Sequence, residues 1–306
     1  MECTNIPTTT ETVSEVNDWL KLIIPATIAI MVFFLGVLIT WLKSNMERRK
    51  DTRHLRTTII TWVTYMDNGV KTLALSCGNL AKRVAETHEI HPEQFKFNFL
   101  HANKVSGIEV TKTIKAFVTN SDGDEGSKNQ NYYKLVSGLD YLGKVEDEIK
   151  SKYDEHYSYT LKLLDNWNES FVAFDNSQRD LATAKVEKDD VRLSMEKDLN
   201  SIIVKWLAAN KKDGQNIIYT HDELLSPFEN IITDYFQRTG SREDEVSKLI
   251  STVQDLIIVY KQWKASKEAY STIFSEYAQK LQKVYDDTLV AAQYFENSTS
   301  VKLLCN

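Results

Sequence analysis

Glycine and proline are scarce in this chain. It contains 10 glycines and 4 prolines among 306 residues, whereas these two residues together make up roughly 12% of average proteins. Folds rich in β-sheet and α/β enzymes need a tight turn after each short element, and Gly and Pro supply many of those turns. The shortage therefore argues against a β-sandwich, a β-barrel or a Rossmann-type fold, and it favours an all-α protein.

Cysteine is also rare, with only Cys3, Cys77 and Cys305. Three widely separated thiols do not make a disulfide framework, and no pair of them has the spacing of a zinc site. The chain contains no phosphate-binding loop, nucleophile elbow or HExxH zinc motif. We therefore expect a protein of a reducing compartment that is not an enzyme and holds no cofactor or metal.

Positive charge is concentrated in one short segment. The formal net charge is −6, so most of the chain offers no basic face to the phosphates of nucleic acid, and we expect no nucleic-acid partner. Residues 43–56 are the exception, because they contain six basic side chains: Lys43, Arg48, Arg49, Lys50, Arg53 and Arg56. Such a cluster determines membrane topology, and we hypothesise that it also contacts lipid headgroups.

A long apolar run precedes the basic cluster. Residues 22–42 contain no charged side chain, and 21 residues of α-helix span about 32 Å, the thickness of a bilayer core. Trp19 and Trp41 flank the run, where amphipathic aromatic rings favour the membrane interface. A buried core helix is the alternative, but such helices are rarely apolar on every face over this length. We therefore predict a transmembrane helix over residues 19–42.

The charge difference across this helix predicts its orientation. Residues 1–18 are acidic and contain no Lys or Arg, whereas basic flanks remain on the cytoplasmic side. The run is too long, and its upstream flank too acidic, for a cleaved signal peptide. The sequence thus predicts a single-pass signal-anchor protein with an acidic extracytoplasmic tail, a basic juxtamembrane segment over 43–56 and a cytoplasmic domain over 57–306.

The cytoplasmic part has the apolar spacing of amphipathic helices almost throughout. We expect one rod from about residue 19 to 88, followed by a helix over about 92–119. The stretch from Tyr132 to Asn210 is interpreted either as one helix of about 120 Å or as two helices with a bend near 185–190. Residues 121–130 are expected to form a loop.

Two further signals mark a short helix after a connector expected over residues 211–219. Ser226, Pro227 and Glu229 match a capping box with proline at the first helical position. Gly240 is expected to end the helix that they start.

The C-terminal region carries a heptad repeat. From Val246 to Phe295, thirteen of the fifteen a and d positions are apolar or aromatic, which is typical of a coiled-coil-like helix. Aromatic d residues are bulky for a two-stranded coil, so we expect an elongated bundle of long, antiparallel helices. The helix-packing seam should include Leu256, Trp263, Phe274 and Leu281. Lys267, at an a position, should lie where the seam is wet, snorkel outward or pair with an acid from a neighbouring helix.

Two weak metal-ligand patterns are interpreted as connectors without metal. His88 and His91 straddle a helix end, so they do not share one helical face. Asp122 to Gly126 resemble part of a calcium loop, but the sixth and twelfth loop positions lack the required Gly and Glu. His156 lies near the apolar stripe of the long helix and is interpreted as a packing residue.

These observations predict a membrane-anchored cytoplasmic helical scaffold, tether or signal-relay protein. It would act through helix packing, either as a homo-oligomer or with a partner protein, and it would contact the lipid bilayer. A membrane effector or channel subunit that assembles through its single span is the alternative, although the span offers few polar groups for an aqueous lining. A second alternative is an enzyme whose site is dispersed over the bundle.

Overall fold

The computed structural model describes residues 11–90, 110–119, 123–184, 189–213, 216–240 and 243–300. Nearly all of these residues are helical, and none of them forms a β-strand. The prediction of an all-α protein is therefore confirmed. Most of the helix expected over 92–119, and His91 with it, lie outside the described residues.

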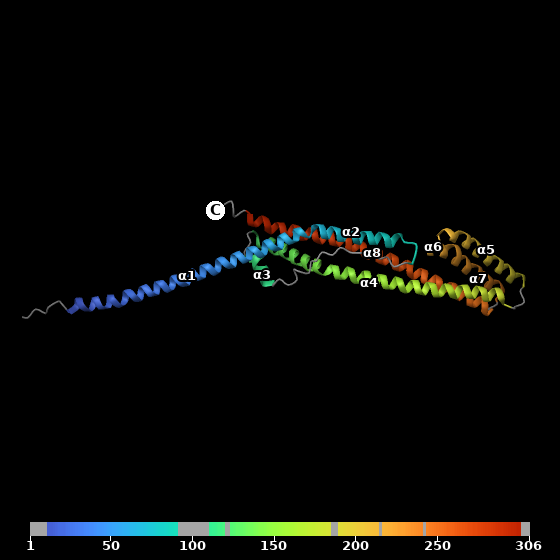
Figure 1. Cartoon of the computed structure of the whole chain (residues 1–306), viewed down its shortest axis with the longest axis horizontal. Coiled ribbons are helices and arrows are strands. Elements are labelled where there is room, and N and C mark those ends of the chain that lie inside the picture. Colours follow the sequence, from blue (N-terminus) through green and yellow to red (C-terminus); the bar gives the residue numbers. More distant parts are fainter. Residues whose placement is uncertain are drawn as a thin grey trace, which may run out of the picture. The chain divides into compact units, whose positions relative to one another are not determined.

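The chain divides into two compact units. The first comprises residues 1–61, 108–132 and 294–306, and the second comprises residues 62–107 and 133–293. Three long helices contribute residues to both units, namely α1 (Glu11–Tyr65), α4 (Glu125–Thr183) and α8 (Asp244–Ser300) (Figure 1).

In the first unit, a small aromatic core holds α1, α4 and α8 around two short turns, α3 (Val110–Ile114) and the π-helical η2 (Lys115–Thr119). Phe117 of η2 packs edge-on against Phe295 of α8, with ring centroids 5.0 Å apart. Its ring also lies 6.4 Å from that of Tyr132. Phe117 therefore joins the end of α8 to the beginning of α4 within this unit.

The expected single rod from 19 to 88 is wrong in one respect, because the helix breaks at Met66 before α2 (Asp67–Glu86) begins. The amide of Met66 donates to the carbonyls of both Trp62 and Val63, each at 3.2 Å. The hydroxyl of Tyr285 donates to the same Val63 carbonyl at 3.2 Å. A side chain that inserts into the helical hydrogen-bond ladder is a known cause of a break, and no sequence pattern near Met66 indicates it.

The loop expected over 121–130 is largely helical, because α4 begins at Glu125. The carboxylate of Asp124 accepts a hydrogen bond from the Ser127 amide at 2.9 Å, which caps the first turn. This bond to a backbone amide also lowers the pKa of Asp124.

At its other end α4 stops at Thr183, and α5 (Asp190–Asp213) follows as a separate helix. The two-helix alternative for 132–210 is therefore correct.

The capping box expected at Ser226 does not form. Helix α6 (Ile217–Thr220), the π-helical turn η3 (His221–Leu225) and α7 (Ser226–Thr239) follow one another without a gap. The Ser226 amide already donates to the His221 carbonyl, so no cap is required there. The cap lies upstream, where the Asn216 side chain accepts from the Tyr219 amide at 3.0 Å. Gly240, with a φ of 64°, ends α7 as expected.

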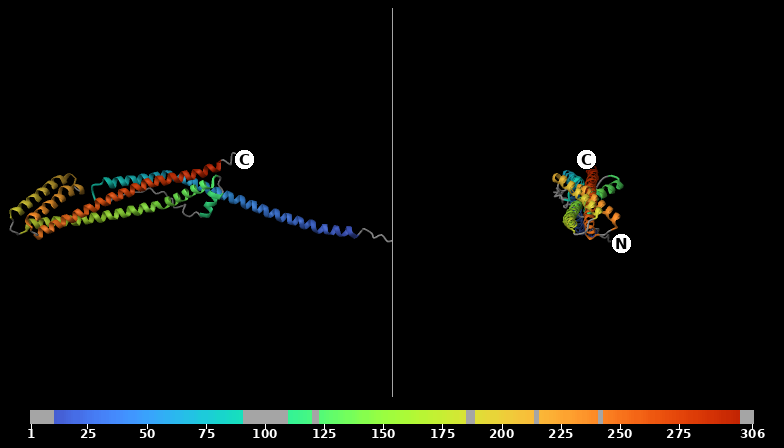
Figure 2. Two further views of the ribbon diagram at one scale, coloured as in Figure 1. Left: turned by 180° about the vertical axis from the view of Figure 1, so that it is seen from behind. Right: turned by 90° about the vertical axis from the view of Figure 1, so that its right-hand side faces the viewer.

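The second unit is built on α2 and on most of the long helices α4 and α8 (Figures 1 and 2). Early residues of α4 meet late residues of α8, as with Tyr141, whose ring centroid lies 4.7 Å from the ammonium of Lys280. Lys248, near the start of α8, pairs instead with Asp180 near the end of α4. Helix α4 is therefore antiparallel to α8, as the heptad repeat predicted for a helical bundle.

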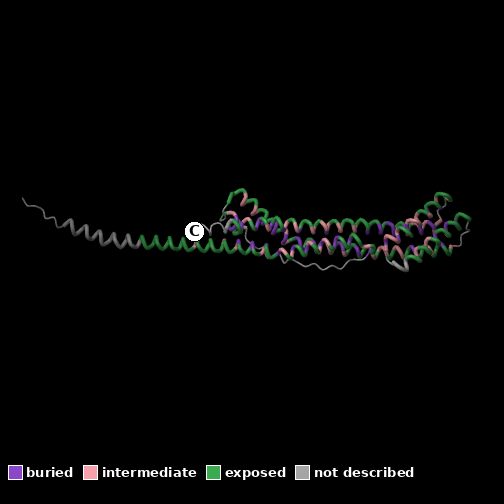
Figure 3. Tube along the Cα trace, turned by 90° about the horizontal axis from the view of Figure 1, so that it is seen from above, coloured by how far each residue is buried: buried purple, intermediate pink, exposed green. Residues whose placement is uncertain are grey.

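Two further helices complete the bundle of the second unit at one end. There α5 and α7 pack against α4 and α8 around a buried apolar cluster. Phe174 of α4 and Phe228 of α7 meet at its centre, with ring centroids 5.3 Å apart. Figure 3 shows that buried residues follow the inner faces of the packed helices. Four helices thus close the core at this end.

Candidate functional site

The apolar part of α1 has no protein cover among the described side chains. The large apolar side chains from Ile30 to Leu42 are 46–68% exposed, and Figure 3 shows this stretch as exposed along its length. Within the described residues, one helix is long and apolar enough to cross a membrane, and its most apolar window is 0% buried. A core helix of a soluble protein would instead bury such a window.

The basic cluster follows this apolar stretch on the same helix. Five of its side chains are exposed: Lys43, Arg48, Arg49, Lys50 and Arg53. Two acids, Glu47 and Asp51, lie among them and are also exposed. Within the described part of the chain none of the five cations has an ion-pair partner, although many lysines and arginines of the second unit do.

Arg56 differs from the other five and does not fit the expected contact with lipid headgroups. Its side chain is only 6% exposed. The guanidinium donates through Nε to the Ala116 carbonyl at 2.9 Å, and Nη2 contacts the same oxygen. It also lies over the Phe117 ring, 5.9 Å from the centroid. Arg56 therefore ties α1 to η2 inside the first unit. It shares the buried face of α1 with Ile59 and Ile60.

The residues expected along the packing seam of α8 lie inside the second unit. Leu256, Phe274 and Leu281 are fully buried, and Trp263 is 4% exposed. Of the fifteen a and d positions from Val246 to Phe295, eleven are buried and none is exposed. Trp263 joins a cluster with Leu163 of α4, and Phe274 joins one with residues of α2.

Lys267 is half-buried where the seam borders a pocket, and it neither snorkels freely nor pairs with an acid. Its ammonium lies 5.0 Å from the Trp263 ring centroid and donates to the Thr87 carbonyl at 2.5 Å. Thr87 is the C-cap of α2, so Lys267 satisfies a carbonyl at a helix end, where a cation is favoured. Burial lowers the pKa of this lysine.

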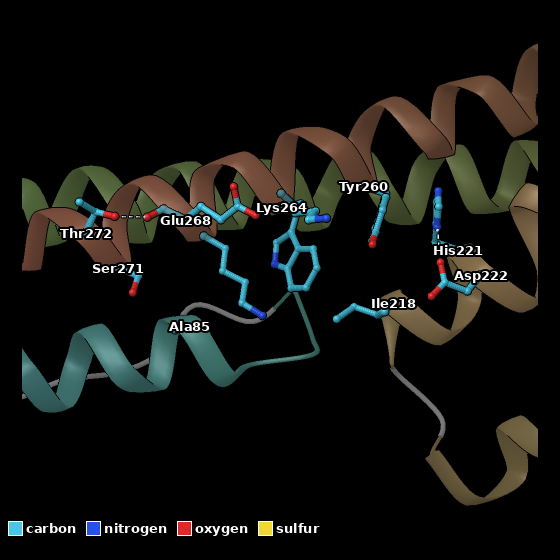
Figure 4. A pocket seen from close by; sticks show the side chains of 11 residues that line it. Ala85, Ile218, His221, Asp222, Tyr260, Lys264, Glu268, Ser271 and Thr272 are labelled. Atoms are coloured by element: carbon cyan, nitrogen blue, oxygen red, sulfur yellow. Dashed lines mark hydrogen bonds and ion pairs between the residues drawn. The ribbon is translucent and has the colours of Figure 1, made fainter. Parts of the chain in front are cut away.

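A pocket of about 740 Å³ opens beside Lys267, where α2 ends and α6 begins (Figure 4). This is within the usual size range of small-molecule sites. A main-chain hydrogen bond connects the two segments at its rim, because the Ile217 amide donates to the His88 carbonyl at 2.9 Å. Tyr260 and Trp263 of α8 supply its aromatic wall.

Several side chains of the pocket are already engaged with one another. The ring of His221 stacks on Tyr260 with centroids 3.9 Å apart, and its Nδ1 lies 2.7 Å from a carboxylate oxygen of Asp222. The Ser271 hydroxyl donates to the Ala81 carbonyl at 3.0 Å. Burial, with the Asp222 charge, raises the pKa of Tyr260. Lys264 and Glu268 add one charge of each sign, so the lining favours neither anions nor cations.

His156 is the most buried histidine among the described residues, at 8% exposure. Its ring lies 4.6 Å from Tyr270 and 6.3 Å from Phe274, and its Nδ1 has no hydrogen-bond partner. Burial lowers the pKa of His156 to about 4, so the imidazole is neutral at pH 7. It therefore packs as an aromatic ring, in agreement with its position in the apolar stripe. Among the described residues no group of three potential ligands is placed to hold a metal ion.

The sequence indicated neither the pocket nor a buried ion-pair cluster in the second unit. In this cluster Arg192 of α5, 1% exposed, pairs with Glu196 at 2.9 Å and with Glu243. The Tyr235 hydroxyl donates to the same Glu243 carboxylate at 2.6 Å. Residues far apart in the chain form both features, so spacing along the sequence carries no signal for them. No protein-family model, curated protein or solved structure matches this chain.

Proposed function

We propose that this protein is a single-pass membrane protein whose helical bundle works in the cytoplasm as a scaffold, tether or signal-relay component. The observation that carries the proposal is the sequence of features along α1. Apolar side chains from Ile30 to Leu42, which none of the described residues covers, are followed within one helix by five exposed cations. A bilayer would cover the first group, and the cytoplasmic side would retain the second.

The proposed orientation places the acidic residues 1–18 outside the cytoplasm and the bundle inside. Support comes from the charge difference across the apolar stretch, since basic flanking segments are retained on the cytoplasmic side. The long helices of the bundle support a mechanical role rather than a chemical one. They present extended surfaces to a second copy of the chain or to a partner protein.

The proposed relay runs through the helix that carries the apolar stretch. Helix α1 continues from that stretch to Tyr65 without interruption. Within the first unit it is fixed to η2 by Arg56, and η2 is fixed to the end of α8 by Phe117. Close-packed elements of this kind pass on small shifts instead of absorbing them. A rotation or displacement of the membrane helix would therefore reach the ends of the bundle helices.

Membrane integration and topology are tested together in cells. Alkaline carbonate should leave the full chain in the membrane pellet. A reporter that is active only in the cytoplasm should be active when it is fused after Asn306. Cys3 should react with a membrane-impermeant thiol reagent added from outside. Extraction by carbonate would contradict the membrane span, whereas labelling of Cys3 only after permeabilisation would reverse the proposed orientation.

A further inference from the structure

We propose that Lys43, Arg48, Arg49, Lys50 and Arg53 form a cationic collar that binds anionic phospholipid headgroups at the cytoplasmic surface of the bilayer. This inference rests on the proposed function, because it requires the preceding apolar stretch to span the membrane. The chemistry that the collar recognises is a phosphate or carboxylate anion, and the source to which we assign it is the lipid headgroup. Basic residues in this position attract anionic lipid through the negative surface potential of the leaflet.

The distance of each cation from the bilayer core follows from the helical rise. At 1.5 Å per residue, a helix normal to the bilayer places Lys43 about 1.5 Å beyond Leu42, and Arg48 to Lys50 about 9–12 Å beyond it. The headgroup layer is about 5–7 Å thick on each side of the core. Lys43 thus lies within this layer, and the next three cations lie within one Debye length, about 8 Å, of its outer edge.

The next two basic residues limit the collar on its far side. Arg53 lies about 16.5 Å beyond Leu42, which is slightly more than one Debye length from the outer edge of the headgroup layer. Arg56 would lie about 21 Å beyond it, and its side chain is buried against Ala116 and Phe117 instead. The transition from exposed to buried cations therefore coincides with the distance at which attraction by lipid becomes weak.

The direction of each side chain around α1 gives the collar its shape. Because each residue turns the helix by about 100°, Arg48, Arg49 and Lys50 point to three different sides. Glu47 and Asp51 are four residues apart and share one face. The collar therefore offers cations to the lipids around most of the helix. An acidic sector of somewhat more than a third of the circumference interrupts it.

The collar cations differ from many other basic residues in that none of them has an ion-pair partner among the described residues. Lys71, Lys144 and Arg179, for example, each pair with an acid one helical turn away, at 2.6–2.8 Å. Within the described residues the five collar cations have no such partner, although two acids lie on the same helix. Their charge is thus available to an external anion.

The test measures lipid selectivity of the full chain in phosphatidylcholine vesicles that contain trace spin-labelled phosphatidylserine or phosphatidylcholine. Electron paramagnetic resonance reports the fraction of each probe immobilised at the protein. We expect about a fivefold preference for phosphatidylserine, the equivalent of one basic residue acting on each contacting lipid. The preference should fall toward one in the variant K43Q/R48Q/R49Q/K50Q and in about 1 M salt, where the Debye length is about 3 Å.

A matched control carries the same loss of four charges elsewhere. The variant K150Q/K162Q/K261Q/K283Q replaces exposed lysines of α4 and α8 and should keep the full preference. R48Q should lower the preference and R56Q should not. Inorganic phosphate at about 10 mM and constant ionic strength should leave it unchanged, whereas displacement by phosphate would assign the collar to a soluble anion and overturn the lipid assignment.

The outcomes separate this inference from the function on which it rests. A chain that resists carbonate extraction but shows equal association with both lipid probes would overturn the collar and leave the membrane span intact. A chain that does not integrate into vesicles would overturn the proposed function itself. An equal loss of preference in the collar variant and in the control variant would reduce the effect to net charge and would also overturn the collar.

Discussion

Gly138 of α4 faces Thr288 of α8 across an interface too narrow for any larger residue. A Cβ placed on Gly138 would lie 3.0 Å from the Cβ of Thr288 and closer still to its hydroxyl oxygen. Both residues are buried, and the Thr288 hydroxyl donates to the Val284 carbonyl at 2.6 Å. The absent side chain therefore sets the separation of the two long helices of the bundle.

The first prediction concerns this contact. Gly138→Ala should destabilise the protein by about 1–3 kcal/mol, because a methyl group has no space without displacing a helix. Gly143 lies on the same helix, and a Cβ there would meet nothing within 4 Å. Gly143→Ala should therefore stabilise by about 0.5–1 kcal/mol, the difference in helix propensity. Thermal unfolding of the full chain, followed by circular dichroism, measures both. Equal effects of the two substitutions would show that α4 and α8 do not approach closely at Gly138.

The second prediction concerns the packing seam of α8. Trp263→Ala and Phe274→Ala should each cost about 3–5 kcal/mol, because both rings are buried and leave cavities. Lys261→Ala and Lys283→Ala alter exposed positions on the same helix and should change stability by about 0.5 kcal/mol or less. Chemical denaturation with a helical signal gives the comparison. Four equal losses would contradict the bundle.

The sequence predicted those features of the fold that depend on local periodicity. Apolar spacing identified the long helices, and the heptad from Val246 to Phe295 identified the buried side of α8. Composition identified the exposed apolar stretch of α1. These signals succeed because a helix places every third or fourth residue on one face, whatever its partner is.

The features that the sequence did not predict depend on partners far away in the chain. The break at Met66 involves Tyr285, and the burial of Arg56 involves Ala116. Ser226 matched a capping box, but the preceding residues were already helical and left it no amide to cap. The pocket beside Tyr260 combines the end of α2 with residues that follow some 130 positions later. Periodicity along one helix carries no information about such meetings.

The third prediction concerns acid stability. His156 has a pKa of about 4 in the folded protein, below its usual 6.5, because burial disfavours the charged imidazole. The unfolded chain therefore binds a proton more readily, so stability is full above about pH 6.5 and falls as the pH drops toward 4. The shift corresponds to at most about 3 kcal/mol, less whatever solvent reaches the ring.

His156→Phe should remove this part of the acid slope while it keeps an aromatic ring between Tyr270 and Phe274. Glu155 and Lys152, which face the same region from α4 and pair at 2.6 Å, are unchanged in the variant. The unfolding free energy, measured at intervals from pH 7.5 to 4, distinguishes the wild type from the variant. Parallel stability curves for the wild type and the variant would show that His156 is accessible to protons in the folded state.

The last prediction concerns the buried ion pair of Arg192 and Glu243. The Arg192 side chain is 2% exposed, and it links α5 to the residue just before α8. Arg192→Ala should cost about 3–5 kcal/mol, because it leaves a carboxylate with little access to water and without its cation. Arg192→Met combined with Glu243→Met should cost less than the sum of the two single changes, since no charge then remains unpaired at that contact.

Arg179→Ala serves as the control. Arg179 pairs with Asp175 at 2.6 Å, close to the 2.9 Å between Arg192 and Glu196. The Arg179 side chain is 73% exposed, however, so its loss should cost less than about 1 kcal/mol. Chemical denaturation measures the loss of unfolding free energy in each variant. Equal losses for Arg192→Ala and Arg179→Ala would show that the end of the bundle formed by α5 and α7 does not exclude water from Arg192, and that the pair does not hold α5 in place.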